Sequence, residues 1–246
     1  MTKLLFVNVD TQNDFMRGSY VMNSVALKGK LVVPGAESIE PNLAIITQLA
    51  QQYGVKVLNT ADSHQHDSPE LSKTPDFQQT FPEHCMIATP GALYVPATDP
   101  IAEPGELYVV DWRHQTIDSA LVRERRNVVA TKNAFNVFDG KNGSPHIEQI
   151  VDVIRPDAVV VYGVAANVCV NFAIHGFSQR GFNISEVGGR HRLYAVTDAT
   201  KALDPDPNAA NPLHSLEQTL GSWEAAGAKL LTTRELVAYV GNDMKR

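Results

Sequence analysis

Five side chains that could take part in catalysis share one feature, because each follows closely after an apolar segment of the sequence. They are Asp10, Asp62, His64, Lys132 and Cys169. A thiol can act as a nucleophile when a nearby carboxylate takes its proton and later returns that proton to a leaving amine. Each of these residues alone is weak evidence, because most lysines are solvated and a carboxylate after a strand often caps a loop.

Cys169 is the candidate nucleophile. It follows a strongly apolar segment at 157–162 and a tight turn that begins at Gly163, and a helix is expected over 167–180. The positive end of a helix dipole would lower the pKa of a thiol in the first turn, and a nearby Lys132 would act in the same direction. The alternative is a buried structural cysteine, which is common in proteins.

A second group of polar residues lies in the loop that follows Asp62. It combines two imidazoles with two carboxylates, contributed by Asp62, His64, Glu70 and His84. Such a set suits zinc, manganese or iron(II). His66 and Asp67 are competing ligands in the same loop. The alternative is an exposed polar loop with scattered histidines.

Apolar strands alternate with helices along the chain. Strands are expected at 4–9, 55–58, 127–131, 157–162, 193–196 and 229–232, with a further short candidate at 106–110. Helices are expected at 41–53, 146–154, 167–180 and 213–226, and from about Arg234 onwards. This order predicts an α/β fold of three layers (α/β/α), with a doubly wound, mainly parallel sheet of about six strands.

The predicted fold positions the chemistry. We expect a single domain over residues 1–246, with a long loop or insert region at about 62–126 that is rich in Pro, His, Asp and Gly. In open parallel sheets, active sites lie at the carboxyl ends of the strands. The acid, the acid–imidazole pair, the lysine and the thiol are therefore expected to meet at one edge of the sheet.

Composition excludes several classes of protein. A net charge of −6 argues against a protein that grips nucleic acid. No run of apolar residues is long enough for a membrane helix, and the short apolar stretch before Asp10 does not resemble a secretion signal. Two cysteines in unlike contexts imply no disulfide framework, so a cytoplasmic location is expected.

Taken together, these motifs resemble the isochorismatase-like cysteine hydrolases, and within them the nicotinamidases. The matching segments occur in the family's order and cover most of the chain: VNVDTQNDF, TADSHQHDSPE, FPEHCMIATPGA, ATKNAF and VYGVAANVCVNFA. The first and last are specific in combination. The segment beginning FPEHC separates nicotinamidase-like members from many relatives.

The resemblance implies a role for each matching residue. The catalytic triad would be Asp10, Lys132 and Cys169, and the metal ligands would be Asp62, His64 and His84 with Glu70 as the fourth and His66 in reserve. The oxyanion hole would be the backbone N–H groups of Ala165 and Cys169, next to a cis peptide at Val164–Ala165. Phe15 and Phe81 would wall the substrate ring.

The turn before Cys169 departs from the family, whose members often read G-x-A-T-D-x-C, because Ala166 and Asn167 stand where Thr and Asp are usual. The segment 133–139, which helps to shape the pocket, also departs from the nicotinamidase pattern.

The resemblance further implies an activity, a cofactor and partners. The activity would be hydrolysis of nicotinamide to nicotinate and ammonia with a divalent metal ion, either zinc or iron or manganese. The partners would be a small amide substrate and further copies of the chain in a homo-oligomer. The alternatives are another small-amide or carbamoyl hydrolase of the family, an isochorismatase, or a non-catalytic metal-binding relative. Isochorismatases lack the metal, so the set of Asp62, His64 and His84 argues against that activity.

Overall fold

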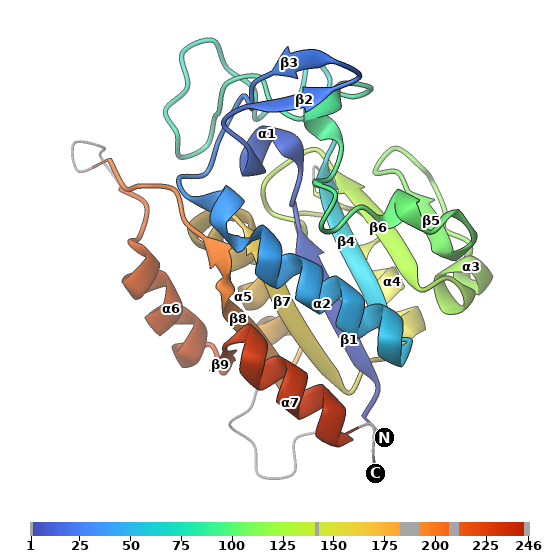
Figure 1. Cartoon of the computed structure of the whole chain (residues 1–246). Helices are drawn as coiled ribbons and strands as arrows, with labels where there is room; N and C mark the ends of the chain where they lie inside the picture. The colour runs from blue at the N-terminus through green and yellow to red at the C-terminus, as the bar shows by residue number, and fades with distance from the viewer. Residues whose placement is uncertain (1, 141–142, 183–191, 207–211, 244–246) are drawn as a thin grey trace.

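The computed structural model describes residues 2–140, 143–182, 192–206 and 212–243 (Figure 1). Within these ranges the centre is a seven-stranded sheet, in which each pair of neighbouring strands is parallel. The order is β5-β6-β4-β1-β7-β8-β9. The strands are β1 Leu4–Val9, β4 Lys56–Asp62, β5 Leu107–Val110, β6 Asn127–Lys132, β7 Ala158–Val164, β8 Arg192–Lys201 and β9 Lys229–Leu231. The predicted α/β fold is confirmed, with seven strands rather than about six.

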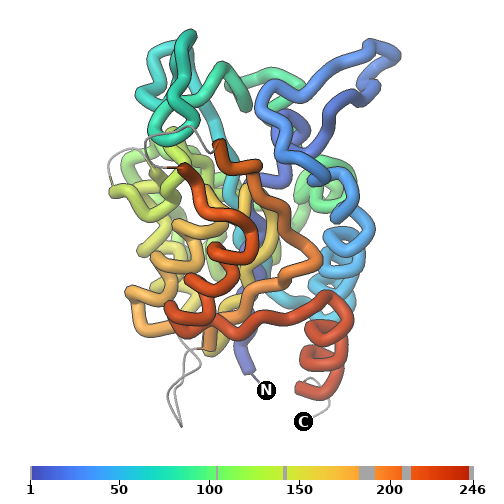
Figure 2. Tube along the Cα trace, turned by 90° about the vertical axis from the view of Figure 1, so that its left-hand side faces the viewer, coloured from blue at the N-terminus to red at the C-terminus, as the bar shows by residue number. Residues whose placement is uncertain are grey.

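Helices cover both faces of the sheet, as predicted (Figures 1 and 2). One face carries α2 Glu40–Tyr53 and α7 Thr233–Asp243, and the other carries α4 Ile147–Ile154, α5 Asn171–Gln179 and α6 Leu216–Ala225. The short α3 Ser119–Glu124 packs against α4. No helix in the described part of the chain is long and apolar enough to cross a membrane.

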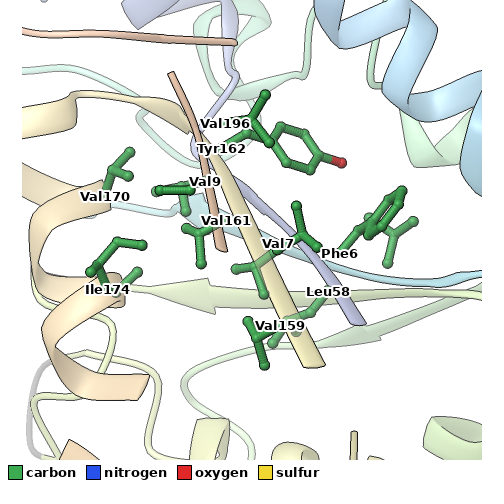
Figure 3. Packing of buried hydrophobic residues seen from close by; sticks show 14 of the residues in the cluster. Phe6, Val7, Val9, Leu58, Val159, Val161, Tyr162, Val170, Ile174 and Val196 are labelled. Atoms are coloured by element: carbon green, nitrogen blue, oxygen red, sulfur yellow. The ribbon is translucent and has the colours of Figure 1, made fainter. Parts of the chain in front are cut away.

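The central strands are apolar on both sides because both faces of the sheet are covered. Every residue of β1 and β7 is buried. Figure 3 shows Val7 and Val161 on the side of Ile174 in α5, whereas Phe6 and Tyr162 point to the opposite side. The rings of Phe6 and Tyr162 meet edge to face, with their centroids 6.4 Å apart. The side chains of a strand point alternately to the two faces of the sheet. In these central strands both sets of side chains therefore pack into a hydrophobic core, and neither set faces solvent.

Several elements differ from the prediction. β8 continues five residues past Val196, because its backbone pairs with β7 again after a register shift, although Thr197 and Asp198 are polar. The region 62–126 contains β5 and α3 as well as loop. The sequence pattern also missed α1 Asn13–Met16 and the antiparallel hairpin of β2 Tyr20–Met22 and β3 Val25–Leu27.

The hairpin and the loop that follows β4 both lie over the carboxyl ends of the central strands, at the top of Figures 1 and 2. The start of β1 and the end of α7 lie at the opposite end of the sheet. These two segments are therefore placed to enclose whatever the strand ends carry.

Gly163 is required where β7 pairs with Val9 at the end of β1. Its φ is +119°, and a Cβ atom there would come within 2.1 Å of the Val9 carbonyl oxygen. We expect Gly163→Ala to lower the free energy of unfolding by about 3 kcal/mol, from backbone strain and overpacking together. Urea denaturation would measure this. Gly18→Ala is the control, because no atom lies within 4 Å of a Cβ at Gly18. Equal midpoints for the two variants would contradict the prediction.

Candidate active site and metal centre

The structure brings together the reactive residues that the sequence placed at strand ends. β6, β4, β1 and β7 are neighbours in the sheet, so their carboxyl ends lie side by side. Lys132 ends β6, Asp62 ends β4, and Asp10 directly follows β1. Cys169 enters from the turn after β7. The convergence predicted from the strand pattern is confirmed.

Lys132 is the positive centre of this group. Its Nζ lies 2.9 Å from Asp10 Oδ2 and 3.8 Å from Cys169 Sγ, and it donates a hydrogen bond to Asp62 Oδ1. Burial alone would lower the pKa of Lys132, but the carboxylates of Asp10 and Asp62 raise it well above its usual value. The lysine therefore stays charged in the interior, where an ammonium group is tolerated only when it is paired.

Asp10 is held at both carboxylate oxygens. Its Oδ1 accepts a 2.6 Å hydrogen bond from Thr60 Oγ1, and its Oδ2 faces Lys132. A carboxylate oxygen of Asp10 also lies within 4.8 Å of Cys169 Sγ. Burial raises the pKa of Asp10, and Lys132 opposes that rise. Asp10 is thus a stronger proton acceptor than a solvated aspartate, and it lies close to the thiol.

Cys169 differs from its prediction in two respects. It lies in a π-helical turn, Ala166–Val170, and the α-helix begins only at Asn171. Burial raises the pKa of the Cys169 thiol well above its usual value, and this outweighs the opposite effect of Lys132. The expected lowering of the pKa was therefore wrong. The resting group is a thiol that needs a base, and Asp10 is placed to be one.

The turn before Cys169 contains the cis peptide that the resemblance implied, between Val164 and Ala165. The Ala165 carbonyl accepts hydrogen bonds from the N–H groups of Val168 and Val170, both at 3.1 Å. These bonds close the π-helical turn around Cys169. Ala165 and Cys169 both line the same pocket.

The four candidate metal ligands form one buried cluster. Four distances between their donor atoms lie between 3.4 and 3.8 Å, and all the donors lie within 4.8 Å of one another. These donors are Asp62 Oδ2, His64 Nε2, Glu70 Oε1 and His84 Nε2. A tetrahedral zinc ion with bonds of about 2.0–2.1 Å requires donors roughly 3.3 Å apart. Oδ2 of Asp62 and both Nε2 atoms have no hydrogen-bond partner among the described residues. The set therefore fits a divalent cation.

Each of three ligands is anchored by its other polar atom. His84 Nδ1 donates to the Pro82 carbonyl at 2.7 Å, and His64 Nδ1 donates to Asn133 Oδ1 at 3.2 Å. Glu70 Oε2 accepts a 2.6 Å hydrogen bond from the Phe135 N–H. Such outer contacts fix the imidazole tautomers and leave each Nε2 free for a metal.

The carboxyl groups of Asp62 and Glu70 dominate the electrostatics of the cluster. Burial alone would lower the pKa of His84, but the carboxylates of Asp62 and Glu70 raise it to about 10. Burial also opposes ionisation of Asp62, yet Lys132 holds the pKa of that carboxyl well below its usual value. A carboxylate held ionised in the protein interior attracts a cation.

His66, the reserve ligand, lies outside the cluster. Its side chain is 85% exposed, and its Nδ1 lies 3.0 Å from Glu83 Oε1. Of the two alternatives for the fourth ligand, the structure brings Glu70 and not His66 to the other three residues.

A narrow pocket joins the thiol to the candidate metal ligands. Its reactive walls are Cys169, Ala165, Asp62, Glu70 and His84, and its apolar walls are Phe15, Leu31, Val33, Phe81, Phe135, Val168 and Leu203. The rings of Phe15 and Phe81 pack against His84, with centroids 5.2 and 6.3 Å away. Phe15 and Phe81 thus line the pocket, and their role towards a substrate ring stays a prediction, whereas Phe135 and Leu203 were not foreseen.

Gln12 is a further residue that the sequence did not single out. Its Oε1 accepts from the Asp62 N–H and its Nε2 donates to the Asp62 carbonyl, both at 2.8 Å. The Gln12 side chain is fully buried and holds the backbone of Asp62, which contacts both Lys132 and the candidate metal ligands. Its position two residues after Asp10 in the first motif was the available signal.

Known proteins share this arrangement of the chain. The isochorismatase domain model matches residues 4–235. The nicotinamidase/pyrazinamidase of Mycobacterium tuberculosis is 28% identical over 167 residues, which cover 66% of this chain and 72% of the relative. The pyrazinamidase of Pyrococcus horikoshii, solved in complex with zinc, is 20% identical with a TM-score of 0.62, over 94% of this chain and 99% of the other. The N-carbamoylsarcosine amidase of Thermoplasma acidophilum is also 20% identical, with a TM-score of 0.61, over 94% and 96%. Since the family model spans most of its length, the chain belongs to the isochorismatase family.

Proposed function

We propose that this chain is a metal-dependent cysteine amidohydrolase that converts nicotinamide and water to nicotinate and ammonia. One observation carries the proposal: the thiol of Cys169 and three of the four candidate metal ligands face a single pocket with aromatic walls. A flat heteroaromatic amide can place its carbonyl at the thiol and its ring nitrogen towards the cluster. The similarity to a mycobacterial nicotinamidase supports the same substrate.

The first half of the proposed reaction forms a thioester. Asp10 takes the proton of the Cys169 thiol, and the sulfur attacks the amide carbon. The backbone N–H groups of Ala165 and Cys169 stabilise the oxyanion that forms on the carbonyl oxygen. Asp10 then protonates the amide nitrogen, the carbon–nitrogen bond breaks, and ammonia leaves.

The second half releases the acid. Asp10, now ionised again, takes a proton from water as the water oxygen attacks the thioester carbon. The carbon–sulfur bond breaks, and the proton held by Asp10 returns to the sulfur of Cys169. Throughout, Lys132 stabilises negative charge on the sulfur and on Asp10, because its Nζ contacts both.

Asp62, His64, Glu70 and His84 would hold the metal ion. When bound, the ion supplies a Lewis acid that anchors the ring nitrogen of the substrate. The chain itself supplies the orientation of the ring, through Phe15 and Phe81 on the pocket walls. Asp62 links the two halves of the site, because its Oδ1 accepts from Lys132 while its Oδ2 belongs to the metal cluster.

A carbamoyl hydrolase is the second candidate, favoured by the similarity in fold to N-carbamoylsarcosine amidase. That substrate carries a carboxylate, which requires a positively charged partner when it is buried. No Arg or Lys occurs among the described residues that line the pocket, and the positive charges of His84 and of a bound ion are already matched by the carboxyl groups of Asp62 and Glu70. The charge of the pocket therefore favours a neutral aromatic amide.

We expect the metal-loaded protein to release ammonia from nicotinamide faster than from benzamide or N-carbamoylsarcosine. Benzamide has the same shape but lacks the ring nitrogen, and N-carbamoylsarcosine introduces the unmatched negative charge. The measurement is kcat/KM for ammonia release from each compound. Faster turnover of N-carbamoylsarcosine would replace the first candidate by the second. No ammonia from nicotinamide would exclude that substrate.

A further inference from the structure

Asn167 joins the nucleophile turn to the segment between β8 and α6. Its Nδ2 donates hydrogen bonds to the carbonyls of Leu203 and His214, both at 2.8 Å. Its Oδ1 accepts from the N–H of Leu203 at 3.0 Å. The side chain is buried and lies two residues before Cys169. One side chain thus fixes the exit of β8 and the entry of α6 against the turn that carries the thiol.

Only a carboxamide can make these three contacts. Two carbonyls need two N–H donors, and the Leu203 N–H needs an acceptor, which settles how the amide is oriented. An aspartate, the residue often present at this place in the family motif, would direct a carboxylate oxygen at two carbonyl oxygens. Buried acceptors facing one another without a donor are costly. Asn167 stands where the family motif often has Asp, and its amide fits the backbone groups that residues 203 and 214 present to it.

We propose that Asn167 is a positioning residue that makes the pocket selective for aromatic amides, by holding Leu203 as one of its walls. Leu203 lines the pocket together with Val168 and Cys169. Its backbone N–H and carbonyl both bond to Asn167, so the position of this wall depends on that amide. The inference rests on the proposed function, because it names what determines the substrate class at the same site.

The test measures how well two aldehydes bind in the pocket, and it does not depend on turnover. Pyridine-3-carboxaldehyde and acetaldehyde each add reversibly to a thiol, and their protection of Cys169 from iodoacetamide is followed by mass spectrometry. We expect Asn167→Asp to raise the half-protecting concentration of the aromatic aldehyde about tenfold, as for loss of an apolar contact. That of acetaldehyde should change less than about twofold. Because both aldehydes react with the same thiol, their ratio cancels any change in its reactivity.

A double-mutant cycle tests whether Asn167 acts through Leu203. Leu203→Ala alone should reproduce the aromatic-specific loss, and Asn167→Asp should add less than about twofold in that background. Asn167→Ser, which brings no charge and keeps one donor, is the second variant if the aspartate variant does not fold, and it should show the same loss in weaker form. Asn42→Asp is the matched control, because Asn42 Nδ2 also donates to a backbone carbonyl, that of Asp198, outside the pocket.

The possible results separate the two proposals. Independent, additive effects of Asn167→Asp and Leu203→Ala would overturn the inference, as would equal loss of protection by both aldehydes. An unprotected wild-type thiol would overturn it as well, because the pocket would then not accept an aromatic ring. Ammonia release by the wild type is measured in parallel. If the aromatic-specific loss is found but nicotinamide is not hydrolysed, the proposed reaction fails and the role of Asn167 stands.

Discussion

Replacing Cys169 by alanine is expected to lower ammonia release from nicotinamide by about 10⁴-fold or more, as loss of a catalytic nucleophile does in other hydrolases. The carbonyl carbon would have no sulfur to attack it, and the proton accepted by Asp10 would have no donor. Metal content should be unchanged, since Cys169 is not one of the four clustered donors. The measurement pairs initial rates with metal analysis of the same preparation.

The other cysteine provides a matched control. Cys85 is fully buried and is the neighbour of His84, one of the four candidate metal ligands. Its backbone N–H donates to Asp14 Oδ2 at 2.7 Å, and that bond survives replacement of the side chain. Cys85→Ala should therefore remain active, with a modest loss of stability from the small cavity. Substantial turnover by Cys169→Ala would show that the thiol is not the nucleophile. Equal losses in both variants would point to packing rather than chemistry.

Residues at the ends of strands were the part of the site that sequence could predict. Asp10, Asp62 and Lys132 each stand at the end of an apolar run, and a parallel sheet brings the carboxyl ends of neighbouring strands together. The pattern does not specify the strand order. Had β7 lain at an edge of the sheet rather than beside β1, Cys169 would have been separated from Lys132. The motif order within the family supplied what the periodicity lacked.

Other features depend on contacts between residues far apart in the chain. Gln12 reaches Asp62, and Asn167 reaches Leu203 and His214, through side-chain bonds that no local pattern predicts. The pKa of Cys169 was mispredicted for a related reason. Its position in a helical turn is local, whereas its burial depends on the whole pocket, and burial has the larger effect.

The same reasoning applies to the fourth candidate metal ligand. His66 and Glu70 lie in one loop, and histidine is a common ligand of zinc, so composition alone does not choose between them. Glu70 is turned inward because its Oε2 accepts from the N–H of Phe135, beyond the end of β6. Glu70 therefore joins the cluster because of a contact with a residue 65 positions away in sequence.

Loss of one imidazole from the metal cluster is expected to have the second large effect. We expect His84→Ala to weaken zinc binding by at least about 100-fold, since loss of outer partners alone costs about 10- to 100-fold. His84 Nε2 is buried without a hydrogen-bond partner among the described residues, and its ring is already oriented by Pro82. The cluster would then be left with one imidazole and two carboxylates. Titration of zinc into metal-free protein measures the affinity.

Thermal unfolding gives an independent readout of the same change. A ligand that binds only the folded state stabilises it by about 2.7 kcal/mol at 100 times its Kd. Zinc should therefore raise the Tm of the wild type and should raise that of His84→Ala much less at the same concentration. Ammonia release should fall in the variant and in chelated wild type, and only the latter should recover when zinc is restored.

His66→Ala is the matched control. His66 belongs to the same loop as His84, but it lies outside the cluster. Because the side chain of His66 is 85% exposed and its ring contacts Glu83 rather than a ligand, zinc affinity and turnover should match those of the wild type. If His66→Ala lost the metal while His84→Ala kept it, the loop would bind metal by a different set of residues. If neither variant changed zinc affinity, the buried cluster would not be the metal site.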